Sequence, residues 1–399
     1  FQSLFMSVSE PCSPSKSFEL VDEKWLAVSS CVDLADENGE NHSDPLLIAR
    51  LSSTNRKKRT IDAFLSDYEG KLDDHIENLR TFARSTGGLI DDDIRRIVWP
   101  VLARNLYKYD HEGPSEPELD ELTDDEANTH KEWNQVQLDV HRTLARFPPN
   151  IDKDERDDLQ TLLTPLIIKL ISARRDFNYY QGLHDVFLTI LLVVGQESAE
   201  DMGRNLIREG VFHDYLSMTL DQGVCKQLEL IYVILSRVDP QIEGIFRQVE
   251  LGPIFALSWP LTWFSHSLHS YKQIVRVFDA FLASDPLLPI YFSSACILYR
   301  RSEILATERE MPFLHHLLGT LPKNLPIDSL ISDALYLTKL IPPLLLKGKY
   351  LKSYKETGPP ISNIAPVVSS ISRYAIQAVF VAGAMSAAAV TYFLSRSVV

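Results

Sequence analysis

Apolar residues recur at three- and four-residue intervals through most of this chain, the spacing that places them on one face of an α-helix. The pattern begins at Ile61, and glycine or proline residues separate successive periodic segments. We find no convincing alternation of apolar and polar residues that would indicate a half-buried strand, and no strand–helix–strand unit. The sequence therefore predicts an all-α domain over residues 61–346.

The expected helices follow from this periodicity and from the residues that end each run. Gly87 and Gly88 supply a stop after the first helices. Pro100 is expected to kink or shorten the next helix, and Pro148 to end a long helix over 124–147. The other helices are expected over 89–102, 159–173, 183–194, 225–238, 255–265, 274–283, 290–307 and 331–340.

Composition excludes several classes of protein. An apolar share of 45% in 399 residues allows a sizeable core, and a net charge of −14 argues against a nucleic-acid binder. No P-loop, G-x-S-x-G or H-E-x-x-H motif occurs, and no His or Cys residues have zinc-ligand spacing. We therefore expect no metal site and no cofactor of its own. The cysteines lie far apart and are expected to be reduced: Cys12, Cys31, Cys225 and Cys296.

Two polar segments allow alternative interpretations. Residues 1–60 are too polar to offset their ordering entropy, so we predict a disordered N-terminal region. Its one basic cluster, RKKR at 56–59, is either a solvated linker or a contact for anionic lipid or a partner. Residues 110–126 hold nine carboxylates and no Lys or Arg. They form either a solvated loop or a surface that guides a basic partner.

The C-terminal region has the composition of a membrane anchor. A linker is expected over 347–370, with lysines at 347, 349, 352 and 355, and residues 375–394 then contain no charge. As a helix this run would span roughly 30 Å, the thickness of a bilayer's hydrocarbon core. We predict a transmembrane tail anchor over 371–399 with the domain in the cytosol, because the lysines precede the span. The alternative is an amphipathic helix docked on the domain. Small residues every fourth position also suit tail-mediated self-association.

Two polar side chains are the candidates for chemistry. Arg142 follows Asp139 by one helical turn, and Gln181 lies in a short run of aromatic and small residues. By spacing alone, Asp-x-x-Arg on a helix is most often a surface ion pair, and Gln-Gly is most often a turn. An arginine and a glutamine supplied together could nevertheless complete the active site of a slow GTPase.

Ordered motifs resemble those of the TBC-domain Rab GTPase-activating proteins. Residues 94–102 (IRRIVWPVL) are similar to the first motif of that family. Residues 136–143 (VQLDVHRT) resemble Ile-x-x-Asp-x-x-Arg-Thr, and residues 179–185 (YYQGLHD) resemble Tyr-x-Gln-Gly-Met-x-Asp. The segments WFS at 263–265 and IVRVFDAFL at 274–282 are similar to two later motifs, so the resemblance covers 80–340.

This resemblance implies a fold of two helical subdomains and a role for each matching residue. Arg142 would be an arginine finger, and Gln181 a glutamine finger that replaces the water-positioning glutamine of the GTPase. The other matching residues would support the site: Asp139 and Arg95 by holding it, Trp99 by packing beneath it, Tyr179 by shaping the loop of Gln181, and Asp185 by anchoring that loop.

The implied partner is a GTP-bound Rab GTPase, which brings its own GTP and Mg²⁺, so the chain alone would turn nothing over. The combination with a C-terminal span resembles a membrane-anchored member of the family at the endoplasmic reticulum (ER) that acts on the Rab of ER-to-Golgi transport. It would imply roles in COPII traffic, Golgi organisation, autophagosome maturation and lipid droplets. A membrane-anchored effector or scaffold without catalytic stimulation is the alternative. A helical solenoid is disfavoured because no fixed repeat period is found.

Overall fold

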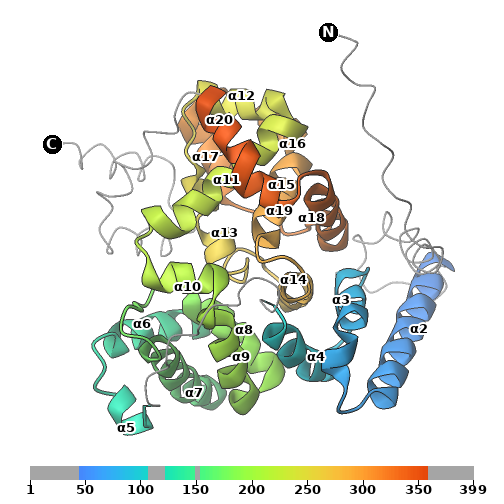
Figure 1. Ribbon diagram of the computed structural model, residues 1–399, viewed down its shortest axis with the longest axis vertical. Helices are drawn as coiled ribbons and strands as arrows, with labels where there is room; N and C mark the ends of the chain where they lie inside the picture. Colours follow the sequence, from blue (N-terminus) through green and yellow to red (C-terminus); the bar gives the residue numbers. More distant parts are fainter. Residues whose placement is uncertain (1–44, 107–121, 149–152, 358–399) are drawn as a thin grey trace.

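The protein is described by a computed structural model in which residues 45–106, 122–148 and 153–357 are placed (Figure 1). Throughout those ranges every regular element is a helix, so the predicted all-α class is confirmed. Figure 1 shows α4 and α6 to α10 in the lower half of the molecule, and α11, α12, α16, α17 and α20 in the upper half. The division into two helical subdomains that the resemblance implies stays a prediction.

The elements have the following bounds, in chain order. The first group comprises α2 Pro45–Asp67, η2 Leu72–His75, α3 Ile76–Arg84, α4 Asp92–Arg104, α5 Asp124–Ala127, α6 Trp133–Leu144, α7 Lys153–Ser172, α8 Leu183–Val194, α9 Gln196–Arg208 and α10 Gly210–Ser217. The second comprises η3 Asp221–Cys225, α11 Lys226–Val238, α12 Pro240–Gln248, η4 Pro253–Ala256, α13 Ser258–Leu261, α14 Tyr271–Leu282, α15 Leu288–Tyr299, α16 Arg301–Ala306, α17 Met311–Gly319, α18 Ile327–Leu340, α19 Pro343–Leu345, η5 Leu346–Tyr350 and α20 Leu351–Thr357.

The first helix begins earlier than the sequence predicts. Because α2 starts at Pro45, residues 45–60 of the segment expected to be disordered are helical, and the expected domain boundary falls inside α2. The reason is a buried contact: the Nζ of Lys57 donates to the carbonyl oxygens of Phe82 (3.1 Å) and Thr86 (2.7 Å) at the end of α3. Lys57 thus docks α2 on α3 and is not part of a solvated linker. Residues 1–44 lie outside the described residues.

Two predicted helices are divided. The helix expected over 124–147 is interrupted between α5 and α6, because the hydroxyl of Thr129 donates to the carbonyl of Glu126 (2.8 Å) and helps close the first turn. The helix expected over 255–265 becomes η4 and α13, followed by Trp263 and Phe264 at positive φ. That backbone turns the following loop toward the candidate site. By contrast, α4 continues through Pro100 without being shortened there.

The helical domain also extends beyond residue 346, into the segment predicted as a linker. Tyr354 on α20 donates to Oε1 of Glu243 on α12 (2.7 Å), and the guanidinium of Arg237 lies 3.5 Å from the centre of the Tyr350 ring. The predicted tail anchor at 371–399 lies outside the described residues. Among the helices that are described, no single one is long and apolar enough to cross a bilayer, whereas α18 and the stretch Pro343–Glu356, bent by 65°, pass together on length and composition.

Helix α8 positions the site because it is the most buried helix of the lower group. All but one of its residues are buried, and it contacts α4, α6, α7 and α9. A helix apolar on every side can only lie inside a domain. Its N-terminus therefore holds the preceding loop, residues 178–182, firmly against α6.

Candidate functional site

Arg142 on α6 is held by a buried carboxylate. Its Nη1 donates to Oδ1 of Asp139 (3.1 Å); the Asp139 side chain is only 1% exposed, while that of Arg142 is 51% exposed. Gln135, one turn earlier, donates to the other oxygen of Asp139 (2.9 Å). The carboxylate is thereby fixed on both sides, and the guanidinium is held while its remaining N–H groups face solvent.

Gln181 lies in the loop that enters α8. Gly182, the next residue, has φ 111°, a conformation that side-chain-bearing residues rarely adopt, so the sharp turn into α8 requires glycine here. The hydroxyl of Tyr180 donates to the carbonyl of Leu261 (3.1 Å), and the amide of Asn178 to that of Leu216 (2.9 Å). Both bonds hold the part of the loop that precedes Gln181. The Oε1 of Gln181 is shielded from solvent yet has no hydrogen-bond partner among the described residues.

A buried hydrogen-bond network joins the loop to α6. The hydroxyl of Tyr179 donates to Oδ2 of Asp139 (3.3 Å) and lies 2.7 Å from Nδ1 of His184. The Nε2 of His184 is 3.0 Å from the hydroxyl of Thr143 on α6. Burial, reinforced by Asp139, raises the pKa of Tyr179 well above its ordinary value, and burial lowers the pKa of His184. At neutral pH the network therefore contains a protonated phenol and an uncharged imidazole.

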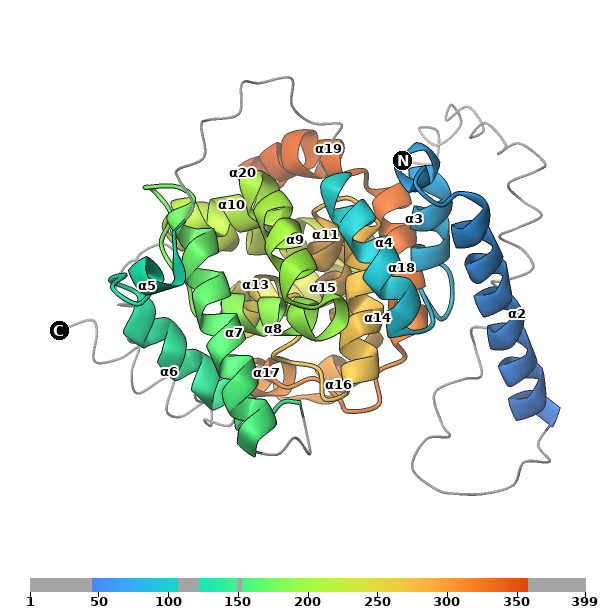
Figure 2. The same ribbon diagram turned by 90° about the horizontal axis from the view of Figure 1, so that it is seen from below.

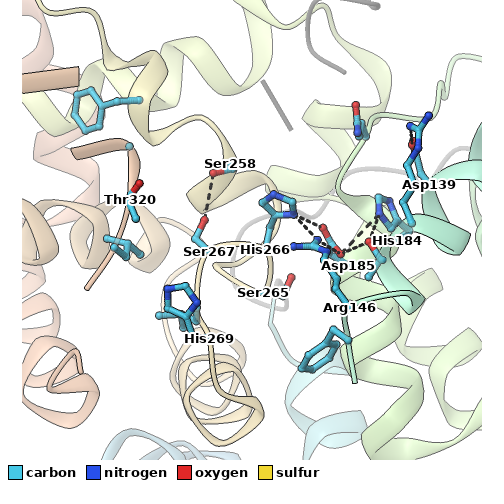
Figure 3. Close-up of a pocket in the computed structure, with 18 of the residues that line it drawn as sticks. Asp139, Arg146, His184, Asp185, Ser258, Ser265, His266, Ser267, His269 and Thr320 are labelled. Carbon is cyan, nitrogen blue, oxygen red and sulfur yellow. Dashed lines mark hydrogen bonds and ion pairs between the residues drawn. The ribbon is translucent and has the colours of Figure 1, made fainter. Parts of the chain in front are cut away.

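Asp185 joins three segments at the first turn of α8 (Figure 3). It accepts from Thr143 (2.9 Å) on α6 and from Arg146 (3.4 Å) just after α6, and lies 3.1 Å from Nδ1 of His266 in the loop after α13. Burial would raise the pKa of Asp185, but the two neighbouring histidines and Arg146 together hold that pKa well below its usual value. Asp185 is therefore an ionised carboxylate that fixes α8, α6 and the 263–269 loop together.

An open pocket of about 680 Å³ lies over this network. Its lining comes from α6, the start of α8, the 265–269 loop and the end of α17. Figure 3 shows Asp139, His184 and Asp185 on one side of it, and His269 and Thr320 on the other. Arg142 and Gln181 both line this pocket. The two candidate side chains, from different elements, thus face one cavity that can admit part of a ligand.

The structure places Arg95 and Trp99 elsewhere. Neither lines the pocket, and both are buried in the interface between α4 and α14. Arg95 donates to both oxygens of Asp279 (3.0 and 3.1 Å), and the indole of Trp99 donates to Oδ1 of the same carboxylate (2.8 Å). Trp99 also stacks on Phe278, which meets Trp263 edge to face. Their connection to the pocket is therefore indirect. Phe278 packs between Trp99 and Trp263, and Trp263 begins the loop whose residues 265–269 line the pocket.

The sequence did not identify several residues of this network. Thr143 and Asp279 lie within quoted motifs, but nothing in the spacing shows that Thr143 forms a hydrogen bond with Asp185 or that Asp279 accepts one from Arg95. His266 lies outside every quoted motif, and in the structure it contacts Asp185 and Arg146. His184 has an ordinary apolar helical context, so its burial between Tyr179 and Thr143 left no signal. In the part of the chain that the structure describes, no cluster of His, Cys, Asp or Glu could hold a metal ion.

Comparisons with known proteins identify the family that the chain is similar to. Residues 92–305 match the family described as the Rab-GTPase-TBC domain. The human protein TBC1 domain family member 20 is 38% identical over 268 residues, which are 67% of this chain and 64% of that protein, so the match leaves more than a third of the relative uncovered. The bovine protein of that name is 36% identical, over 72% of this chain and 68% of its own length. The GTPase-activating protein gyp10 of Schizosaccharomyces pombe is 26% identical, over 68% and 70%.

Two solved structures share the fold. The flagellar RabGAP TBC domain of Chlamydomonas has a TM-score of 0.51 and 14% identity, covering 74% of this chain and 98% of its own. The Ypt/Rab-GAP domain of Gyp1p has a TM-score of 0.53 and 16% identity, covering 72% of this chain and 99% of its own. At these identities the likeness concerns the fold alone.

Proposed function

The chain belongs to the Rab-GTPase-TBC domain family, and from that membership we propose that it stimulates GTP hydrolysis by a Rab GTPase, with Arg142 and Gln181 supplied in trans. One observation carries this proposal: the guanidinium and the carboxamide come from different elements yet line a single pocket. Because Tyr179 bonds to the carboxylate that holds Arg142, the two groups are positioned together.

The chemistry of the two side chains suits phosphoryl transfer. Negative charge spreads over the phosphate oxygens in the transition state, and the planar fork of an arginine can contact two of them at once. Asp139 already restricts the rotamers of Arg142, so less entropy is lost when the guanidinium engages the nucleotide. The Oε1 of Gln181 has no hydrogen-bond partner among the described residues, and a rotation of this side chain on Rab binding would expose that oxygen to the water aimed at the γ-phosphate. GTP and Mg²⁺ would come with the partner.

We propose further that the chain is tail-anchored at the ER, with its helical domain in the cytosol. The support is the uncharged run at 375–394 and the lysines before it. By its likeness to the membrane-anchored members of the family, the partner would be the Rab of ER-to-Golgi transport. The pathways affected would be COPII traffic, Golgi organisation, autophagosome maturation and lipid-droplet control.

A single-turnover assay on a GTP-loaded Rab tests the catalytic proposal. Wild type should accelerate hydrolysis, and Arg142→Ala and Gln181→Ala should each reduce the acceleration by at least about a hundredfold. Arg96→Ala is the matched control, because Arg96 is an exposed arginine on α4 paired only with exposed Asp93. If wild type and both variants bind the Rab equally but none accelerates hydrolysis, the chain is a non-catalytic effector or scaffold.

A further inference from the structure

The end of α18 and the short α19 present a surface that the pocket and its network do not use. Four large apolar side chains are exposed there, Tyr336, Leu340, Leu344 and Leu345, and Leu344 is 85% exposed. Three exposed lysines lie close to them in the chain: Lys339 between Tyr336 and Leu340, and Lys347 and Lys349 after Leu345. We name these seven residues the α18–α19 patch. A protein does not usually leave several large apolar side chains together in water without a binding role.

The exposure of the patch is built into the fold. The hydroxyl of Tyr291 donates to the carbonyl of Ile341, which fixes the bend between α18 and α19. Leu346 is fully buried, and Tyr350 and Tyr354 are held by Arg237 and Glu243. Positions 346, 350 and 354 therefore face inward at helical spacing. The intervening Lys347 and Lys349, and the preceding Leu344 and Leu345, are left facing outward.

The charge of this region is opposite to that of the whole chain. The chain carries a net charge of −14, yet residues 334–355 contain five lysines and no Asp or Glu. Lys355 is paired with Glu229 (2.8 Å) and Lys352 lies 4.0 Å from Glu356, which leaves the three lysines of the patch to act outward. Exposed Asp333, one turn before Leu337, is the nearest carboxylate along α18. Apolar side chains mixed with lysines match the interface of an anionic bilayer, where acyl chains lie beneath negative headgroups.

We propose that the α18–α19 patch docks on the surface of an anionic lipid bilayer, its apolar side chains entering the interface and its lysines contacting the headgroups. The rest of the chain is repelled by such a surface, so the patch also sets the orientation. In Figure 2, α19 lies along one edge of the molecule, while α6 and α17, which supply pocket residues, lie along the opposite edge. This inference depends on neither the catalytic proposal nor the tail anchor.

A fluorescent reporter on the full chain tests it. With Cys12 and Cys31 changed to serine, Leu344→Cys carries an environment-sensitive dye. The two remaining thiols, of Cys225 and Cys296, are buried. Burial, together with Asp221 and Glu229, raises the pKa of Cys225 to about 12, and burial also raises the pKa of Cys296. Both thiols should therefore react slowly with the dye. Vesicles of phosphatidylcholine with phosphatidylserine should increase the emission at least about twofold over phosphatidylcholine alone. A dye at Met218→Cys, exposed on another element, should not change.

Charge variants separate this docking from other occupants. The double variant Lys347→Glu, Lys349→Glu should abolish the increase in emission of the dye at position 344. The matched control Lys71→Glu, Lys153→Glu makes an equal change of charge at exposed sites elsewhere and should leave that increase unchanged. Equal thermal midpoints would show that both pairs fold. The proposal is overturned if the dye at 344 is already shielded without vesicles, which indicates another part of the chain, or if its emission follows protein concentration, which indicates a second copy. Equal responses to neutral and anionic vesicles would overturn it as well, because tail insertion alone would explain them.

Discussion

The hydroxyl of Tyr179 lies 3.3 Å from Oδ2 of Asp139, whose other oxygen accepts from Arg142. One buried carboxylate therefore receives bonds from the helix of the candidate arginine finger and from the loop of the candidate glutamine finger. The position of Gln181 relative to Arg142 is set by this shared partner, since only one residue separates Gln181 from Tyr179.

Tyr179→Phe should reduce stimulated GTP hydrolysis by about tenfold or more while leaving Rab binding nearly unchanged. The ring still packs, but Asp139 loses one donor and His184 loses its nearest hydrogen-bond partner, and a hydrogen bond to a charged group is worth about 1.5–3 kcal/mol. Single-turnover hydrolysis and Rab titration measure the two effects. Tyr354→Phe is the control, because that buried hydroxyl donates to Glu243 on α12 and neither residue lines the pocket. Full stimulation by Tyr179→Phe would show that the two fingers need no shared partner.

Gly182→Ala should damage catalysis out of proportion to its effect on stability. At φ 111° a Cβ costs roughly 1–2 kcal/mol, and the loop can relieve that strain only by moving Gln181. Gly195 at the other end of α8 also has positive φ, 79°, and a Cβ added there would meet no heavy atom of the surrounding structure within 4 Å. Gly195→Ala should lower the unfolding midpoint in urea similarly but keep stimulation. Equal losses of stimulation in both variants would contradict a positioning role for Gly182.

Asp185 should make the stability of the protein dependent on acid pH. Its pKa in the fold lies well below the unfolded value of about 3.8, so its stabilising effect is complete above pH 4 and is lost as the pH falls toward the folded pKa. Asp185→Asn should therefore lower the free energy of unfolding at pH 7, measured by urea titration, by about 1–3 kcal/mol. The difference in free energy of unfolding between this variant and wild type should narrow below pH 4. Exposed Glu69→Gln should show no gap at pH 7. A gap that stays constant down to pH 3 would contradict this prediction.

Sequence reasoning succeeded where periodicity leaves a local signal, because helical spacing identified the all-α class. Motif resemblance selected Arg142 and Gln181, which spacing alone would have dismissed and which both line the pocket; their catalytic role stays a prediction. Sequence reasoning failed where contacts between residues that are distant in the chain determine the structure. The docking of α2 depends on Lys57 reaching carbonyls at residues 82–86, and the role of Asp279 depends on Arg95, which is distant in sequence. A polar segment such as 45–60 gives no indication that one lysine in it will be buried.

Removing residues 371–399 should release the protein from membranes washed at high salt, where the lysines of the α18–α19 patch are screened, and should leave its activity on a soluble Rab unchanged. The described domain ends at Thr357, and none of the described residues beyond Leu321 lines the pocket, so both fingers and their supports lie outside the removed segment. An anchor instead raises the local concentration of the two fingers near a membrane-bound partner, which is a gain that dilute solution does not show. Fractionation of cells and single-turnover hydrolysis with the truncated chain measure the two effects. A control that replaces 375–394 with an unrelated apolar helix should restore membrane association. Membrane association that persists after truncation would contradict the tail anchor and leave the α18–α19 patch as the membrane contact.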